Sequence, residues 1–204
     1  MHFLHLIVSI GFGHLLGSIP FGLLLTKLKG VGDIRKVGSG NIGATNVLRT
    51  GHKGLAFATL LMDALKGLFP VIFVGIWEPY LGAMAGIAAI LGHVFPIWLK
   101  FKGGKGVATS FGVLLAIAPL FALVGVIAWL MVAFIWRYSS LAALVSSLLL
   151  PILAMFFGSQ QQMMVTIFIA FLTIFTHKDN IKRIIKHQEP KIGSHAKPRT
   201  NKEV

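Results

Sequence analysis

The sequence predicts an all-α, polytopic integral membrane helix bundle of about seven transmembrane helices, with the N-terminus outside and the C-terminus cytoplasmic. Three observations support this fold class. Apolar residues make up 55% of the 204-residue chain and charged residues only 12%, whereas charged residues are about a quarter of a typical soluble domain. The mean hydropathy is +0.81. Long apolar runs recur at roughly the 20-residue length that a membrane-spanning helix needs.

Six apolar runs give the predicted spans in chain order. The first is expected to be a retained span rather than a signal peptide, because no Lys or Arg precedes it and no small-residue cleavage site follows it. The fourth is too long for one helix and contains Pro119, which removes a helix hydrogen bond. We therefore expect it to divide near Pro119 into two helices of about 15 residues each, which is short for a span. The runs cover residues 3–26, 54–77, 80–98, 107–136, 139–157 and 162–176.

The basic residues predict which side of the membrane each loop occupies. Of the 19 Lys and Arg, six lie in residues 27–53, three in 100–105 and eight in the tail from Lys178 onward. The positive-inside rule places these three segments in the cytoplasm. An even number of spans must then separate the 100–105 loop from the tail, which requires the division at Pro119 and gives seven spans. Residues 1–204 are expected to form a single membrane-embedded domain, with a basic cytoplasmic tail at about 177–204.

The formal net charge of +13 and the absence of cysteine narrow the function classes. A basic balance is typical of proteins that bind nucleic acid or a membrane surface. The long apolar runs favour the membrane, so no nucleic-acid partner is expected. The absence of cysteine excludes disulfides, thiolate chemistry and Cys-ligated metals. Since His2, His5 and His14 have no acidic neighbours, neither a metal nor a cofactor is expected.

Two glycine-rich segments on the predicted cytoplasmic side combine glycines, hydroxyls and cations before an apolar helix. Glycine lets a backbone approach a ligand closely, amide N–H groups at a helix N-terminus favour an anion, and Arg or Lys suits a phosphate. The alternative is that the glycines only form interfacial turns and the cations only set topology. Neither segment is a Walker A loop, since glycine follows Lys105 and no strand precedes it. The candidate ligands are Ser39, Gly40, Asn41, Gly43, Thr45, Asn46 and Arg49 in the first segment, and Lys102, Gly103, Gly104, Lys105, Gly106 and Thr109 in the second.

Polar side chains near or within the spans give further candidates. His177 and Asn180, where the last span ends, share one helix face and could overlook the same site, or simply cap the helix. His93, at the cytoplasmic end of the third span, is a binding candidate or a hydrogen-bonded packing residue. Asp63 and Lys66 lie within the second span. At positions i and i+3 they can form a buried structural ion pair, with a contribution to a site as the alternative.

The motifs of covalent catalysis are absent from the sequence. There is no Gly-x-Ser-x-Gly nucleophile elbow and no His-x4-Asp pair. The principal rival to an enzyme is a transporter or channel for small phosphate esters. Transporters often show inverted repeats and place their sites near the midplane. Here the polar segments lie on one side, and the repeat is limited to a Gly-rich, Ala-Thr likeness between two segments.

The polar segments match, in order and spacing, those of a known family. They read Ser-Gly-Asn-x-Gly-Ala-Thr-Asn-x-x-Arg at 39–49, Gly-His-x-Phe-Pro…Phe-Lys-Gly-Gly-Lys-Gly-Val-Ala-Thr at 92–109 and His-Lys-x-Asn-Ile-x-Arg at 177–183. Together with residues 17–20 and 63–67, they resemble the bacterial membrane glycerol-3-phosphate acyltransferases that use acyl phosphate as donor. One departure is His187, where that family usually has a glycine two residues before a glutamate. Histidine adopts a positive φ less readily than glycine.

The resemblance implies an enzyme of the cell inner membrane with its active site facing the cytoplasm. The implied reaction transfers an acyl chain from acyl phosphate to the 1-hydroxyl of sn-glycerol 3-phosphate, in phospholipid biosynthesis. Acyl phosphate, glycerol 3-phosphate and membrane lipid are the implied partners, with a functional link to the enzyme that makes acyl phosphate. Because acyl phosphate is already activated, no covalent intermediate is expected, and either the donor phosphate or His177 accepts the proton. The implied catalytic residues are Ser39, Arg49, Lys105, His177 and Asn180.

Overall fold

The computed structural model of the chain describes residues 2–194, and over that range it is helical with no strand. Two short 3₁₀ helices lie in the connections between α-helices, η1 between α2 and α3 and η2 between α5 and α6. The elements are α1 His2–Gly17, α2 Phe21–Leu28, η1 Ile34–Lys36, α3 Ala44–Leu48, α4 Lys53–Gly75, α5 Pro79–Val94, η2 Ile97–Leu99, α6 Val107–Ile117, α7 Pro119–Trp136, α8 Ser139–Phe157, α9 Gln160–Thr176 and α10 Lys178–Ile185.

Five helical segments of the described chain are long and apolar enough to cross a membrane. They are α1 with α2 over Phe3–Leu28, α4, α5 with η2 over Pro79–Leu99, α7 and α8. A sixth candidate joins α9 and α10, which are bent by 61° relative to each other. α6 is a shorter apolar helix of 11 residues. The predicted all-α, polytopic membrane fold is confirmed. The count of seven crossings, which requires α6 to be one of them, and the orientation of the termini stay predictions.

The predicted break at Pro119 is present. α6 ends at Ile117 and α7 begins at Pro119, with Ala118 alone between them. Proline takes the first position of α7, where its missing N–H would have no intrahelical partner. The expected lengths of about 15 residues each were wrong, since α6 has 11 residues and α7 has 18. The two helices differ in length because Pro119 begins α7 and lies before the midpoint of the apolar run over residues 107–136.

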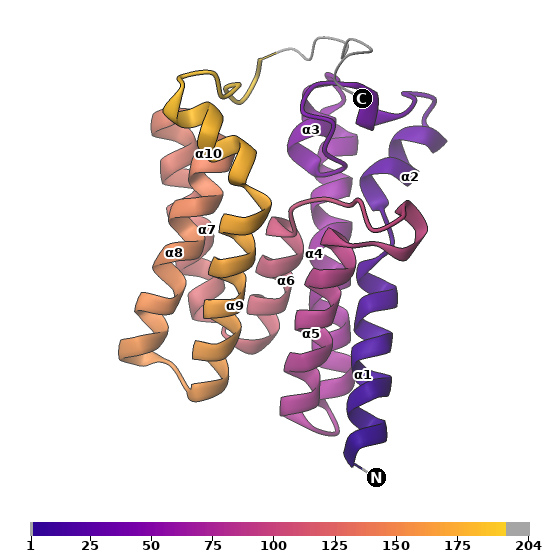
Figure 1. Cartoon of the computed structure of the whole chain (residues 1–204), viewed down its shortest axis with the longest axis vertical. Helices are drawn as coiled ribbons and strands as arrows, with labels where there is room; N and C mark the ends of the chain where they lie inside the picture. Colours follow the sequence, from indigo (N-terminus) through magenta and orange to yellow (C-terminus); the bar gives the residue numbers. More distant parts are fainter. Residues whose placement is uncertain (1, 195–204) are drawn as a thin grey trace.

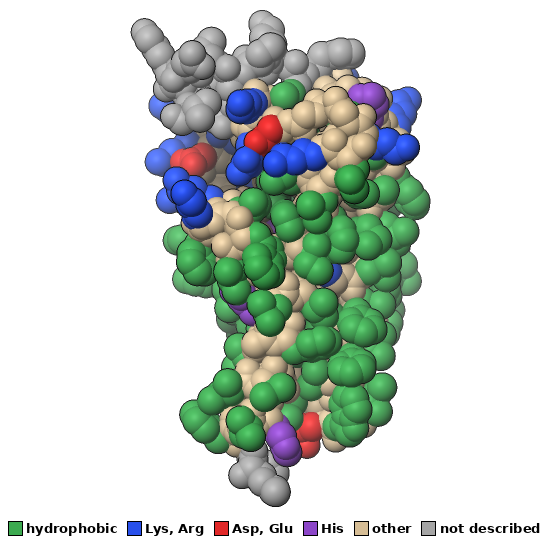
Figure 2. All heavy atoms as spheres, turned by 90° about the vertical axis from the view of Figure 1, so that its right-hand side faces the viewer, with side chains coloured by type: hydrophobic (Ala, Val, Ile, Leu, Met, Phe, Trp, Pro, Cys, Tyr) green, Lys and Arg blue, Asp and Glu red, His purple; other side chains and the backbone are tan. Residues whose placement is uncertain are grey.

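The basic side chains gather at one end of the bundle. Figure 1 shows α2, α3 and α10 at the end opposite the N-terminus. On the face seen in Figure 2, Lys and Arg side chains cluster at that end, above a broad band of apolar side chains. A single basic end is the arrangement that the positive-inside rule predicts for the cytoplasmic side. Residues 195–204 of the predicted basic tail lie outside the described residues.

Small residues bring two pairs of helices into backbone contact. A Cβ added to Gly13 or Gly17 of α1 would lie 2.0 Å from a carbonyl oxygen of α5. A Cβ added to Gly67 of α4 would lie 2.2 Å from the carbonyl oxygen of Thr109 in α6. No side chain fits in these contacts, and glycine therefore lets the helices approach closely, as is common in membrane bundles. The α4–α6 contact holds the start of α6 against the second span.

Candidate active site

The first glycine-rich segment is organised around the side chain of Asn46, which is 2% exposed. Its Nδ2 donates to the carbonyl oxygens of Ile34 at 2.9 Å, Val37 at 3.0 Å and Asn41 at 2.8 Å. Its Oδ1 accepts a hydrogen bond from the Ser39 amide at 3.1 Å. Both ends of the Asn46 amide are therefore engaged within the protein, and this residue holds the loop in shape.

The other candidates of this segment lie half-buried along the loop. The Asn41 side chain accepts from the Gly43 amide at 3.1 Å, which places Gly43 as the cap of α3. Gly40 has a φ of +71°, the left-handed region that favours glycine. The Thr45 hydroxyl is 3.1 Å from the hydroxyl of Ser139, the first residue of α8. This contact joins the segment to the C-terminal half of the bundle.

The second glycine-rich segment folds tightly against the end of α5. The Gly103 amide donates to the Val94 carbonyl at 3.0 Å, and the Gly104 amide donates to the His93 carbonyl at 3.0 Å. A Cβ added to Gly104 would lie only 2.1 Å from Nε2 of His93, so the histidine ring lies directly against this glycine. Gly106, with a φ of +79°, then turns the chain into α6. The glycines are required here by close approach and by backbone conformation.

The His93 ring belongs to a buried polar cluster inside the bundle. Lys66 Nζ lies 2.9 Å from Asp63 Oδ1, which confirms the predicted buried ion pair. His93 Nδ1 lies 3.7 Å from the same carboxylate oxygen. Lys66 Nζ also donates to the carbonyl oxygen of Ile19 at 2.7 Å, at the break between α1 and α2. The three side chains are 2–5% exposed. Direct contact between His93 and a substrate therefore stays a prediction.

The third polar cluster is centred on Glu189, which follows α10. Lys105 donates to the side-chain oxygen of Asn180, and Asn180 Nδ2 donates to Glu189 Oε1 at 2.6 Å. Ser140 donates to the same Glu189 oxygen at 2.7 Å. Arg183 Nε forms an ion pair with Glu189 Oε2 at 2.7 Å. One carboxylate thereby joins the second glycine-rich segment, the start of α8 and α10.

The cations at the basic end lie close enough to shift one another's pKa values. Burial lowers the pKa of Lys105 to about 8; the charge of Glu189 opposes this shift, and those of Arg183 and Arg49 add to it. Burial also lowers the pKa of Arg49, with Glu189 again opposing and Arg183 adding. Arg49 Nε is buried and has no hydrogen-bond partner among residues 2–194. Arg49 and Lys105 thus lie within the same charged group.

Glu189 stays ionised in this setting. Burial alone would raise the pKa of its carboxyl group, but hydrogen bonds from Ser140, Asn180 and Arg183 outweigh burial and hold the pKa below its usual value. Around this carboxylate lie three cations: Arg49, Lys105 and Arg183. The group carries more positive than negative charge, as an anion-binding site requires.

His177 lies at the junction of α9 and α10 and is 2% exposed. Its Nδ1 is 2.8 Å from the carbonyl oxygen of Thr173. Because a carbonyl can only accept, Nδ1 carries the proton, and in the neutral ring Nε2 keeps the free lone pair. Asn180 lies on the following turn, as the sequence predicted, and it bonds to Lys105.

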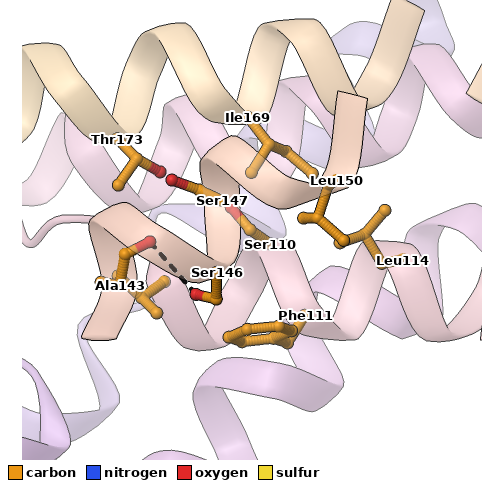
Figure 3. Close-up of a pocket in the computed structure, with 10 residues that line it drawn as sticks. Ser110, Phe111, Leu114, Ala143, Ser146, Ser147, Leu150, Ile169 and Thr173 are labelled. Carbon is orange, nitrogen blue, oxygen red and sulfur yellow. Dashed lines mark hydrogen bonds between the residues drawn. The ribbon is translucent and has the colours of Figure 1, made fainter. Parts of the chain in front are cut away.

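A small pocket lies one helical turn from His177, between α6, α8 and α9. Thr173, whose carbonyl accepts from His177, lines it with Ser110 and Ser147 (Figure 3). The hydroxyls of Thr173 and Ser147 point toward one another in that view. Apolar side chains form the rest of its wall, among them Phe111, Leu114, Leu150 and Ile169.

The structure brings some predicted site residues together and separates others. Arg49, Lys105 and Asn180 gather around Glu189. Lys102 is exposed, and Thr109 is fully buried against Gly67. Across residues 2–194, no group of three or more His, Asp or Glu side chains could hold a metal ion.

Glu189, Arg183 and Ser140 belong to this cluster, although they are not among the site residues predicted from the sequence. The sequence contains a clue to two of them. Arg183 ends the third motif, and Glu189 lies two residues after His187, where the resembled family has a glycine before its glutamate. Ser140 has no such clue, because it is one of two consecutive serines that begin an apolar helix.

Comparisons with known proteins place the chain in a family. Residues 7–187 match the sequence profile of glycerol-3-phosphate acyltransferase. A glycerol-3-phosphate acyltransferase of Mesorhizobium japonicum is 53% identical over 189 residues, which cover 93% of this chain and 97% of the relative. A glycerol-3-phosphate acyltransferase of Agrobacterium fabrum is 52% identical over 182 residues, which cover 89% of each.

The fold resembles two crystal structures of PlsY (YgiH), an integral membrane glycerol 3-phosphate acyltransferase. Its glycerol 3-phosphate form has a TM-score of 0.86 at 37% identity, over 92% of this chain and 96% of that one. Its lysophosphatidic acid form has a TM-score of 0.85 at 36% identity, over 93% and 96%. Since the profile spans most of the chain and the relatives match over nearly their full lengths, the chain belongs to the glycerol-3-phosphate acyltransferase family.

Proposed function

We propose that the protein transfers an acyl chain from acyl phosphate to the 1-hydroxyl of sn-glycerol 3-phosphate, giving 1-acyl-glycerol 3-phosphate and inorganic phosphate. Family membership supports acyl transfer to glycerol 3-phosphate. The observation that carries the proposal is the excess of cations around Glu189. Arg49, Lys105 and Arg183 share that field, and Arg49 Nε has no bonding partner among the described residues. A phosphate dianion would supply the missing charge and acceptors.

The acceptor phosphate takes one cation from each glycine-rich segment, and the rest of the first segment holds the donor. Arg49 and Lys105 bind the phosphate of glycerol 3-phosphate, and Lys102 adds charge at the exposed rim. His177 and Asn180 orient the reacting groups. The glycines at 103, 104 and 106 shape the acceptor loop, and Thr109 anchors its end. The acyl phosphate is held by the first segment, through Ser39, Gly40, Asn41, Gly43 and Thr45, with Asn46 fixing the loop.

The reaction needs no covalent enzyme intermediate, because acyl phosphate is a mixed anhydride with a good leaving group. The acceptor hydroxyl oxygen forms a bond to the acyl carbonyl carbon, and the bond from that carbon to the phosphate oxygen breaks. The hydroxyl proton passes to the donor phosphate, so catalysis is assisted by the substrate. Positioning two bound reactants can supply roughly 7–11 kcal/mol of the barrier. His177 Nε2 as general base is the alternative.

The site lies at the basic end of the bundle, which we assign to the cytoplasmic side of the inner membrane. The chain then crosses seven times, with α6 as a short crossing, and the N-terminus is outside. The acyl chain stays within the bilayer. An enzyme that makes acyl phosphate would supply the donor.

The test is reconstitution of the purified full chain in a bilayer with acyl phosphate and labelled glycerol 3-phosphate. We expect labelled lysophosphatidic acid and released phosphate in equal amounts, and no product when acyl-CoA replaces acyl phosphate. Arg49→Ala and Lys105→Ala should lower kcat/KM for glycerol 3-phosphate by about 10- to 100-fold, as expected for a lost charged hydrogen bond. Lys100→Ala, an exposed lysine of the same loop, is the control. Near-normal kinetics in both site variants would overturn the assignment.

A further inference from the structure

The loop that carries Lys105 is held from two directions. On one side, Lys105 bonds to Asn180 at the start of α10. On the other, Gly103 and Gly104 donate to carbonyl oxygens at the end of α5. The His93 ring lies directly against Gly104, since an added Cβ would be 2.1 Å from Nε2 and about 3 Å from the adjacent ring carbons. The position of that ring therefore limits where the loop, and with it Lys105, can lie.

Charged groups of α4 lie beside the other edge of the His93 ring, whose Nδ1 has no hydrogen-bond partner among residues 2–194. Asp63 Oδ1 lies 3.7 Å from His93 Nδ1 and 2.9 Å from Lys66 Nζ. Lys66 is fixed by a second contact, a 2.7 Å hydrogen bond to the Ile19 carbonyl. That carbonyl lies at the break between α1 and α2, outside either helix. Lys66 Nζ also lies 5.8 Å from the centre of the Phe21 ring.

Charged groups inside a membrane bundle are costly, and they are typically kept where they serve a function. Here the pair links two places where helices are interrupted: the α1–α2 break through Lys66, and the Gly103–Gly104 turn through His93. Neither end of the cluster touches the groups assigned to the phosphates. The cluster can act on the site only through the loop that it supports.

We propose that Asp63, Lys66 and His93 form a positioning cluster that sets the place of the Lys105 loop and thereby the affinity for the acceptor phosphate. The inference rests on the proposed function, because it assigns Lys105 to that phosphate. It makes His93 a positioning residue rather than a ligand of the substrate. Disturbing the ring should weaken binding of glycerol 3-phosphate without changing use of the acyl donor.

Two amide substitutions separate the two ends of the His93 ring. The Asn amide lies near the position of Nδ1 and can still face Asp63, but it leaves the space under Gly104 empty. The longer Gln amide reaches toward the position of Nε2 and keeps that space filled. We expect His93→Ala and His93→Asn to raise KM for glycerol 3-phosphate about 10- to 100-fold, as for a misplaced binding group. His93→Gln should restore much of the affinity.

The measurements are KM for each substrate, kcat, direct binding of labelled glycerol 3-phosphate and the midpoint of thermal unfolding, all on the full chain in a bilayer. Asp63→Asn should raise the same KM, and its effect should not add to that of His93→Ala, because both act on one ring. Thr166→Ala removes a fully buried hydroxyl from α9 and is the control. KM for acyl phosphate should stay within about twofold in every variant.

Three outcomes would overturn the positioning cluster. One is a fall in kcat with an unchanged KM for glycerol 3-phosphate. Another is a lowered unfolding midpoint with both KM values raised together, which marks a purely structural role. The third is His93→Gln as impaired as His93→Ala while Asp63→Asn is normal, which marks direct contact with substrate. Failure of the proposed function is distinct, because the unchanged protein would then neither bind glycerol 3-phosphate nor form product.

Discussion

Lys105 donates a hydrogen bond to the side-chain oxygen of Asn180, 75 residues further along the chain. Asn180 also contacts Glu189, because its Nδ2 donates a hydrogen bond to Glu189 Oε1 at 2.6 Å. An amide suits this place, since one end must accept from a cation and the other must donate to a carboxylate. The pair joins the loop before α6 to α10, so the second and third polar segments of the sequence lie together in the structure.

Asn180→Leu should impair both stability and activity. The change leaves the Lys105 ammonium and the Glu189 carboxylate each one partner short, which costs about 1–3 kcal/mol for a buried polar group. We expect a lower unfolding midpoint and a fall in kcat/KM of at least about tenfold, measured by thermal unfolding and initial rates. Asp179→Asn is the control, because it removes an exposed 3.9 Å ion pair with Lys182 and only a minor charge contribution to Lys105. Equal behaviour of the two variants would contradict the assigned network.

Binding of glycerol 3-phosphate should weaken as the pH rises through about 8. In the free protein the pKa of Lys105 is about 8, so the ammonium group is charged below that pH and loses its proton above it. Only the charged form attracts a phosphate dianion. KM for glycerol 3-phosphate should therefore be flat at lower pH and rise above about 8. In Lys105→Arg the guanidinium stays protonated, and this inflection should vanish. The same inflection in that variant would exclude Lys105 as its source.

His177→Gln tests which group accepts the hydroxyl proton. Removing a general base typically costs about 10²–10⁴-fold in rate and removes one limb of the pH profile. If the donor phosphate accepts the proton, the loss should be well below that range and the profile of kcat should be unchanged. The control is His5→Gln, because His5 lies in the first turn of α1, at the opposite end of the bundle from α10. A large loss together with an altered profile would assign the base to His177.

His187→Gly should stabilise the protein. His187 has a φ of +55° and follows the end of α10, where its amide donates to Ile184 and the next amide donates to Arg183. This is the αL position that normally favours glycine. A non-glycine residue costs roughly 1–2 kcal/mol there, partly offset by the greater freedom of an unfolded glycine. We expect a net gain of about 0.5–1 kcal/mol, seen as a higher unfolding midpoint with unchanged kinetics. Lys186→Gly, at a φ of −86°, should instead destabilise.

Local features of the sequence predicted most of the helices. The run over 139–157 has the same bounds as α8. The chain breaks beside Pro119, whose missing N–H favours the start of a helix, whereas α4 and α8 continue through Pro70 and Pro151. The turn at His187 is different, because the histidine put it in doubt and it forms with a φ of +55° all the same. The predicted lengths of α6 and α7 were wrong, because Pro119 begins the second helix and does not lie at the midpoint of the run.

The motif residues could be identified from the sequence, but the partners of each side chain could not. Asn46 was expected to bind substrate, and its amide is instead engaged by four groups of its own loop. His93 faces Asp63 rather than the cations around Glu189.

The sequence by itself determined the membrane class, the division at Pro119, the basic end and the residue types able to bind phosphate. These follow from composition, hydropathy and charge, which are properties of each segment alone. Only the tertiary structure decided that Glu189 joins Lys105, Asn180 and Ser140, and that His93 supports Gly104. The physical reason is that such contacts depend on how helices far apart in the chain pack, which glycines such as Gly67 allow by admitting a neighbouring backbone.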